Sequence, residues 1–114
     1  MAQDFEGSGA QITNSATTLL TANSDDAIVG IRLANVLTSA VTVDVFIDDN
    51  GSGTLRYIVK GLALPASSSV ELVQGGSKIV LNSGDVLKGQ SNTASSVDVW
   101  LSRVDSHKEY RWLR

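Results

Sequence analysis

The sequence contains no cysteine, one proline and one histidine, and six of its 114 residues are aromatic (two Phe, two Tyr and two Trp). Without cysteine, the chain can form neither a disulfide framework nor a thiolate zinc site. A membrane helix needs roughly 20 consecutive apolar residues, and no segment approaches that length. The first residues, MAQDFEGSGA, have neither the basic start nor the apolar run of a signal peptide. These absences predict one soluble domain, stabilised by packing or by partners.

The formal net charge of -3 argues against non-specific nucleic-acid binding, which requires a broad basic surface. The charge is unevenly distributed along the chain. Four basic residues stand against two acidic ones over residues 103–114, a balance of +2, so the first 102 residues carry -5. We therefore expect neither a nucleic-acid nor a membrane partner, and we expect the last dozen residues to differ in character from the rest.

Apolar side chains recur with a period of two, which is typical of strands with one buried face. Over residues 41–48 the odd positions are apolar, and the even positions are Thr42, Asp44, Phe46 and Asp48. Over residues 97–102, Val97, Val99 and Leu101 alternate with Asp98, Trp100 and Ser102. Other candidate strands lie near residues 11–13, 17–21, 27–36, 55–61, 68–73, 78–82 and 85–90.

Short turn segments rich in Gly, Asn, Asp and Ser separate these candidate strands, and no long stretch keeps a helical period. This pattern predicts an all-β fold: an antiparallel β-sandwich, jelly-roll-like or immunoglobulin-like, of about eight strands with extended terminal arms. We expect an N-terminal arm over residues 1–10, a sandwich domain over residues 11–105 and a C-terminal arm over residues 106–114.

The stretch FIDDNGSGTLRY, residues 46–57, concentrates acidic side chains more tightly than any other segment. A helix-loop-helix calcium loop with Gly51 in its sixth position would have Phe46 first and Tyr57 twelfth, so two essential ligands are lost. Asn50 and Gly51 between two strand-like runs instead predict a hairpin turn. The alternative is a weak cation or glycan site at Asp48, Asp49 and Asn50.

No other constellation predicts catalysis. His107, the single histidine, lies in the polar C-terminal segment without a nucleophile beside it in the sequence. The glycine-rich turns lack the strand-loop-helix arrangement of a phosphate-binding loop. We therefore expect no enzyme activity and no catalytic, cofactor-binding or metal-binding residues. Phe46 and Trp100 could together form a glycan-binding platform, although coverage by a second sheet or a neighbouring subunit is the favoured interpretation.

Three segments carry a resemblance, and together they cover about residues 12–105. In chain order they contain AIVGIRLANVLTSAVTVDVFI, YIVKGLALPASSSVEL and LVQGGSKIVLNSGDVLKGQSNTASSVDVWLSRVD. This order resembles the small β-sandwich virion structural proteins of tailed bacteriophages, which include head decoration or cement proteins and neck or tail accessory proteins.

The resemblance implies a non-enzymatic virion protein without cofactors, located in the virion, whose partners are other virion proteins and copies of itself. A capsid decoration or cement subunit is the leading expectation. The alternatives are a neck, tail or fibre-adaptor component, and a glycan-binding β-sandwich module.

The C-terminal arm is the predicted partner-binding segment. The period of two is lost after Val104, and large apolar side chains then appear among basic ones. Aromatic residues and arginine dominate interface hot spots, and an arm can become ordered as it binds a partner. The predicted partner-binding residues are Tyr110, Arg111, Trp112, Leu113 and Arg114. A loose tail, or one packed on its own sandwich, is the alternative.

Overall fold

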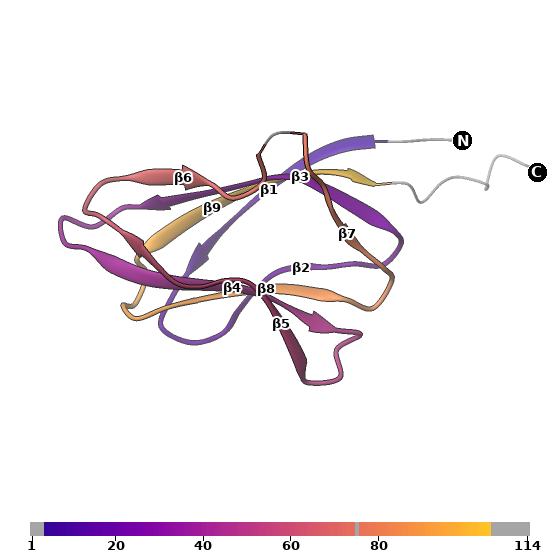
Figure 1. Cartoon of the computed structure of the whole chain (residues 1–114), viewed down its shortest axis with the longest axis horizontal. Coiled ribbons are helices and arrows are strands. Elements are labelled where there is room, and N and C mark those ends of the chain that lie inside the picture. Colours follow the sequence, from indigo (N-terminus) through magenta and orange to yellow (C-terminus); the bar gives the residue numbers. More distant parts are fainter. Residues whose placement is uncertain (1–3, 75, 106–114) are drawn as a thin grey trace, which may run out of the picture.

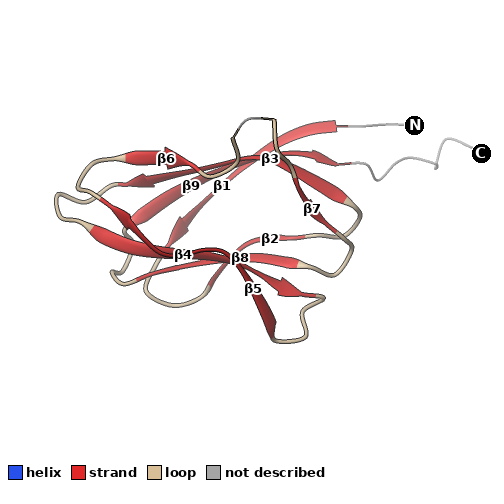
Figure 2. Cartoon of the chain, in the orientation of Figure 1, coloured by secondary structure: helices blue, strands red, loops and turns tan. Residues whose placement is uncertain are grey.

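The computed structural model describes residues 4–74 and 76–105, which form strands joined by turns and loops, without a helix (Figure 2). No helix in this part of the chain could therefore cross a membrane. The strands are β1 (Asp4–Ile12), β2 (Thr17–Thr21), β3 (Asp26–Asn35), β4 (Val41–Asp49), β5 (Thr54–Leu64), β6 (Ser69–Glu71), β7 (Ile79–Leu81), β8 (Val86–Ser91) and β9 (Val97–Asp105).

The strands form two sheets that lie one above the other (Figure 1). Sheet A has the order β1-β9-β3-β6, and β7 also pairs with β3 beyond the end of β6. Sheet B has the order β2-β8-β4-β5. Every neighbouring pair is antiparallel. The predicted antiparallel β-sandwich is confirmed.

The strand pairing is nested. The first strand pairs with the last (β1 with β9), the second with the next to last (β2 with β8), β3 with the split strand β6 and β7, and β4 with β5. In an immunoglobulin sandwich the first two strands belong to one sheet, whereas β1 and β2 here lie in different sheets. Nested pairs wrapped into two sheets are the jelly-roll arrangement, so the structure selects the first of the two expected forms.

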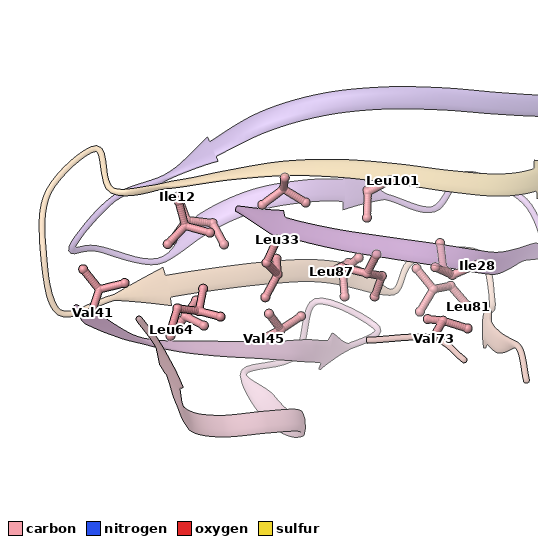
Figure 3. Close-up of a cluster of buried hydrophobic side chains, with 14 of the residues drawn as sticks. Ile12, Ile28, Leu33, Val41, Val45, Leu64, Val73, Leu81, Leu87 and Leu101 are labelled. Carbon is pink, nitrogen blue, oxygen red and sulfur yellow. The ribbon is translucent and has the colours of Figure 1, made fainter. Parts of the chain in front are cut away.

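The core lies between the sheets, and its members from β4 and β9 are those predicted from the period of two (Figure 3). Val41, Val43 and Val45 of β4 point inward from sheet B, and Val97, Val99 and Leu101 of β9 point inward from sheet A. The buried cluster also contains Ile12, Ile28, Ile31, Leu33, Leu64, Leu81 and Leu87. Both predicted face assignments are therefore correct.

The hairpin of β4 and β5 is irregular. The register shifts twice along the pair, and β5 contributes the extra residues at both shifts. Gly61 lies at one of them with a φ of 71°, a conformation that disfavours a side chain. Its backbone N–H donates to Oδ1 of Asp44 over 2.7 Å. Bulges bend the strand that contains them, and the β4–β5 hairpin accordingly projects away from the sandwich in Figure 1.

The segment after β4 is the predicted hairpin turn. Asn50 and Gly51 have φ values of 54° and 64°. The carboxylate of Asp48 accepts the backbone N–H of Gly53 over 2.8 Å and lies 3.5 Å from Nζ of Lys88. Asp85, from the turn before β8, accepts the N–H of Asn50 over 2.9 Å. The carboxylates of Asp48 and Asp85 therefore hold the turn through hydrogen bonds to its backbone.

Residues 4–10 were expected in an N-terminal arm, but they belong to β1 and pair with β9 without interruption. The expectation failed because Gly7 and Gly9 provide no side-chain pattern of their own, and the indole of Trp100 on β9 packs against both. The sandwich domain therefore includes strand residues before Gln11. The predicted C-terminal arm, residues 106–114, lies outside the described residues and remains a prediction.

Truncating the core should be costly. Leu101→Ala removes a side chain that is 2% exposed, and we expect the free energy of unfolding to fall by about 2–5 kcal/mol through lost burial and the remaining cavity. Chemical denaturation of the full chain measures this change. A loss below about 1 kcal/mol would contradict the inward assignment of Leu101.

The two turn carboxylates should differ. Asp48→Ala leaves the Gly53 N–H and Lys88 without their acceptor, so the free energy of unfolding should fall by about 1–3 kcal/mol. The neighbouring residue Asp49 is exposed and gives a matched control. Asp49→Ala should change the free energy of unfolding by no more than about 0.5 kcal/mol. Equal effects in denaturation experiments would contradict the assigned role of Asp48.

Candidate interaction surface

The predicted partner-binding residues Tyr110, Arg111, Trp112, Leu113 and Arg114 lie outside the described residues, so their role remains a prediction. Within the described chain, the outer face of sheet A is the surface that exposes the most large apolar side chains. The outer face of sheet A consists of the side chains of β1, β9, β3, β6 and β7 that point away from sheet B. Three exposed large side chains lie on it: Phe5, Val80 and Trp100.

One row of apolar side chains crosses this face near the two described ends of the chain. Phe5 of β1 pairs with Val104 of β9, Val104 pairs with Ala27 of β3, and Ala27 pairs with Val80 of β7. Paired residues in antiparallel strands point to the same face, so the four side chains form a continuous band. Phe5 is 83% exposed and Val80 is 60% exposed. The band is therefore open to solvent over the described part of the chain.

Trp100 lies in the middle of the same face, and two glycines provide its support. A Cβ atom at Gly7 would lie 2.6 Å from Cζ2 of Trp100, and one at Gly9 would lie 3.2 Å from Cε3. The indole therefore lies over the backbone of β1, in space that any side chain at Gly7 would occupy. Trp100 is nevertheless 55% exposed. Trp100 therefore adds an exposed aromatic ring to the face that carries the apolar row.

A shallow depression of about 410 Å³ adjoins Trp100. Gly9 and Ala34 are among the small residues that line it, and Gln11, Arg32 and Asp98 supply its polar groups. Nε2 of Gln11 donates to Oδ1 of Asp98 over 2.8 Å. The depression therefore combines an aromatic ring with groups that donate and accept hydrogen bonds.

The outer face of sheet B has a different character. Phe46 is only 3% exposed, and its ring centroid lies 5.1 Å from that of Tyr57. Nζ of Lys60 lies 4.5 Å from the centroid of the Tyr57 ring. Trp100 belongs to the other sheet, so Phe46 and Trp100 do not form the glycan-binding platform considered above. The two residues share an outward orientation but point in opposite directions, which alternation along single strands does not reveal.

An acid pair is buried inside sheet A beside the apolar row. Asp26 and Asp105 face each other across β3 and β9, and they are 2% and 6% exposed. The hydroxyl of Ser24 lies 3.3 Å from Oδ1 of Asp26 and 2.8 Å from Oδ1 of Asp105. Nε of Arg103 lies 4.0 Å from Asp26, and the same guanidinium contacts Glu6 over 2.5 Å. Burial, followed by the nearby charge of Asp105, raises the pKa of Asp26.

This raised pKa has a predictable consequence for stability. The folded protein keeps the Asp26 proton at pH values where the unfolded chain, with an ordinary pKa of 3.8, has released it. The free energy of unfolding should therefore fall as pH rises above that value and should level off once the raised pKa is passed.

The variant Asp26→Asn should remove this dependence, because an amide stays neutral and can donate to Asp105. We expect its stability relative to the wild type, measured by urea denaturation, to increase as pH rises above 3.8 and to level off once the raised pKa is passed. Asp25→Asn, a change at the neighbouring exposed residue, is the control. An unchanged pH slope in Asp26→Asn would contradict the effect of burial.

The remaining candidate groups do not gather into a metal site. In the residues that the structure describes, no cluster of three or more His, Asp or Glu side chains is placed to hold a metal ion. Asp48, Asp49 and Asn50, for which a weak cation or glycan site was the alternative, lie at the turn described above. Sequence analysis missed the apolar row of sheet A, because its members come from four strands and no local pattern connects them.

Comparison with protein-family models finds no match, and neither does comparison with curated proteins. Solved structures give a likeness of fold. The structure of infectious bursal disease virus Gx strain matches with a TM-score of 0.50 and 14% identity, over 95% of this chain and 32% of that chain. A pentameric capsid protein isolated from metagenomic phage sequences matches with a TM-score of 0.49 and 20% identity, over 87% of this chain and 58% of that chain.

A third structure, of Bacillus endospore appendages that form disulfide-linked pili, matches with a TM-score of 0.46 and 14% identity, over 94% of this chain and 88% of that chain. Of the two viral proteins, by contrast, this chain spans less than two thirds of the length. At 14% identity, the match to the bursal disease virus structure shows a shared fold.

Proposed function

We propose that the chain is a non-enzymatic structural subunit of a virus particle, and specifically a decoration or cement subunit on the capsid of a tailed bacteriophage. The observation that carries the proposal is the outer face of sheet A. This sheet surface exposes Phe5, Val80 and Trp100, and exposed apolar and aromatic side chains of this kind are suited to a protein partner.

Two further observations support this role. Jelly rolls recur in viral capsid domains, and the structure of infectious bursal disease virus shares this fold with a TM-score of 0.50. The order of strands and turns over residues 12–105 also resembles the small β proteins of phage particles. The resemblance includes neck, tail and fibre-adaptor proteins, so a component of that kind is the nearest alternative.

Microscopy of virions whose genome encodes the chain tests the location. We expect density for this jelly roll to repeat over the capsid shell, as a cement subunit requires. Density confined to one ring would favour a neck or tail component. Failure to detect the chain in purified virions by mass spectrometry would contradict the proposal.

Variants of the exposed row test the surface. Phe5→Ser combined with Val80→Ser should weaken attachment to the particle at least about tenfold, because both side chains are exposed in the free chain and would be buried at the interface. Leu55→Ser, which alters a 40% exposed leucine on sheet B, is the matched control. Equal attachment by the double variant and the control would show that this face does not bind the particle.

The depression beside Trp100 favours a second candidate function, glycan binding. A sugar ring packs against an exposed indole, and Gln11, Arg32 and Asp98 could bond its hydroxyl groups. A glycan array probed with the full chain and with Trp100→Ala distinguishes the candidates. Signal that depends on Trp100 would support the glycan site, and an empty array would remove it.

A further inference from the structure

In the described residues the two sheets have four edges, and three of these edges carry features that block pairing with another chain. In sheet B, β5 has two register shifts and Lys60, and β2 is five residues long with a register shift. The opposite edge of sheet A is split into β6 and β7, which have three residues each. Short, bulged or lysine-bearing edges are the devices that keep sheets from joining.

The fourth edge, β1, has none of these features. It is nine residues long, DFEGSGAQI, and it follows β9 from Asp4 to Ile12 without a register shift. It contains no Pro, Lys or Arg. Its inward-pointing carboxylate, Glu6, is neutralised by Arg103 over 2.5 Å. In the described part of the chain no strand pairs with the other side of β1, so that side presents backbone donors and acceptors for a further strand.

We infer that β1 pairs antiparallel with β1 of a second copy of the chain, across a two-fold axis that joins the two copies of sheet A into one continuous sheet. A two-fold axis is the commonest symmetry of protein oligomers and brings the same segment of each copy together. This inference concerns the free protein and does not require the proposed role in a virus particle.

The sequence of β1 is compatible with itself in this arrangement. The register that pairs all nine residues has its centre at Ser8, so Ser8 faces Ser8 of the second copy, and Gly7 faces Gly9. Phe5 then faces Gln11, and Glu6 faces Ala10. No pair brings like charges together, which would be destabilising. A centre at Glu6, by contrast, would place two carboxylates opposite each other.

In the same register, the outer faces of the two copies of sheet A lie side by side on one surface of the joined sheet. Paired residues with numbers of equal parity point to the same side, so the glycines of both copies lie on one surface. Each Trp100 indole covers Gly7 and Gly9 of its own β1, so the two rings would lie next to the junction, one from each copy. Their contact would add apolar burial to the backbone hydrogen bonds.

A single introduced cysteine tests the register, because the chain has none of its own. Paired residues in antiparallel strands have Cα atoms about 4.5–5.5 Å apart, which lies within the range of a disulfide. In the full chain, Ser8→Cys should form a disulfide-linked dimer at least about tenfold faster than Thr18→Cys, whose cysteine lies on the exposed edge of β2. Mild oxidation followed by non-reducing electrophoresis measures both rates.

Two results would overturn the inference: equal cross-linking of both variants, or a wild-type chain that sediments as a monomer at every concentration tested. Hydrogen exchange of the wild type provides a measurement without mutation. Backbone amides of β1 should exchange more slowly as protein concentration rises, whereas those of β5 should not change. Protection of β1 that is independent of concentration would also contradict the pairing. None of these experiments measures attachment to the particle. A negative result would therefore contradict the β1 pairing without contradicting the proposed function.

Discussion

The pairing of β9 with both β1 and β3 is the constraint on which the other features of the structure depend. Because side chains alternate along β9, one register determines which of its residues enter the core and which form the outer face of sheet A. Leu101 points inward and Trp100 points outward for the same reason. A shift of one residue would exchange the two faces, burying Trp100 and exposing Leu101. The core and the candidate interaction surface are therefore two results of one pairing.

Much of this arrangement follows from local sequence. The valines of β4 and the alternation in β9 predicted the buried faces correctly, because a half-buried strand must alternate whatever it pairs with. Asn50 and Gly51 predicted the turn for a similar reason, since both tolerate a positive φ. These are properties of single strands and turns, and they do not depend on neighbours that are distant in the chain.

The features that sequence analysis missed all depend on neighbours in space. Residues 4–10 were expected in an arm, but they form most of β1, where the indole of Trp100 from the last strand packs against Gly7 and Gly9. The period of two also could not show that Phe46 and Trp100 point away from the sandwich on opposite sides. The acid pair of Asp26 and Asp105 joins residues that are far apart in the sequence, and each looks like an ordinary surface carboxylate until the sheet brings them together.

The nested strand order also determines how the protein folds. Asp4 pairs with Asp105, so sheet A cannot be completed until nearly the whole described chain is available. Long-range pairing of this kind makes folding slow, because loop closure must precede the contacts that stabilise it. During synthesis, β1 leaves the ribosome long before β9 and must wait without its partner. Gly7 and Gly9 give the middle of this strand no apolar side chains during that interval, and Trp100 packs against them only after β9 has been synthesised.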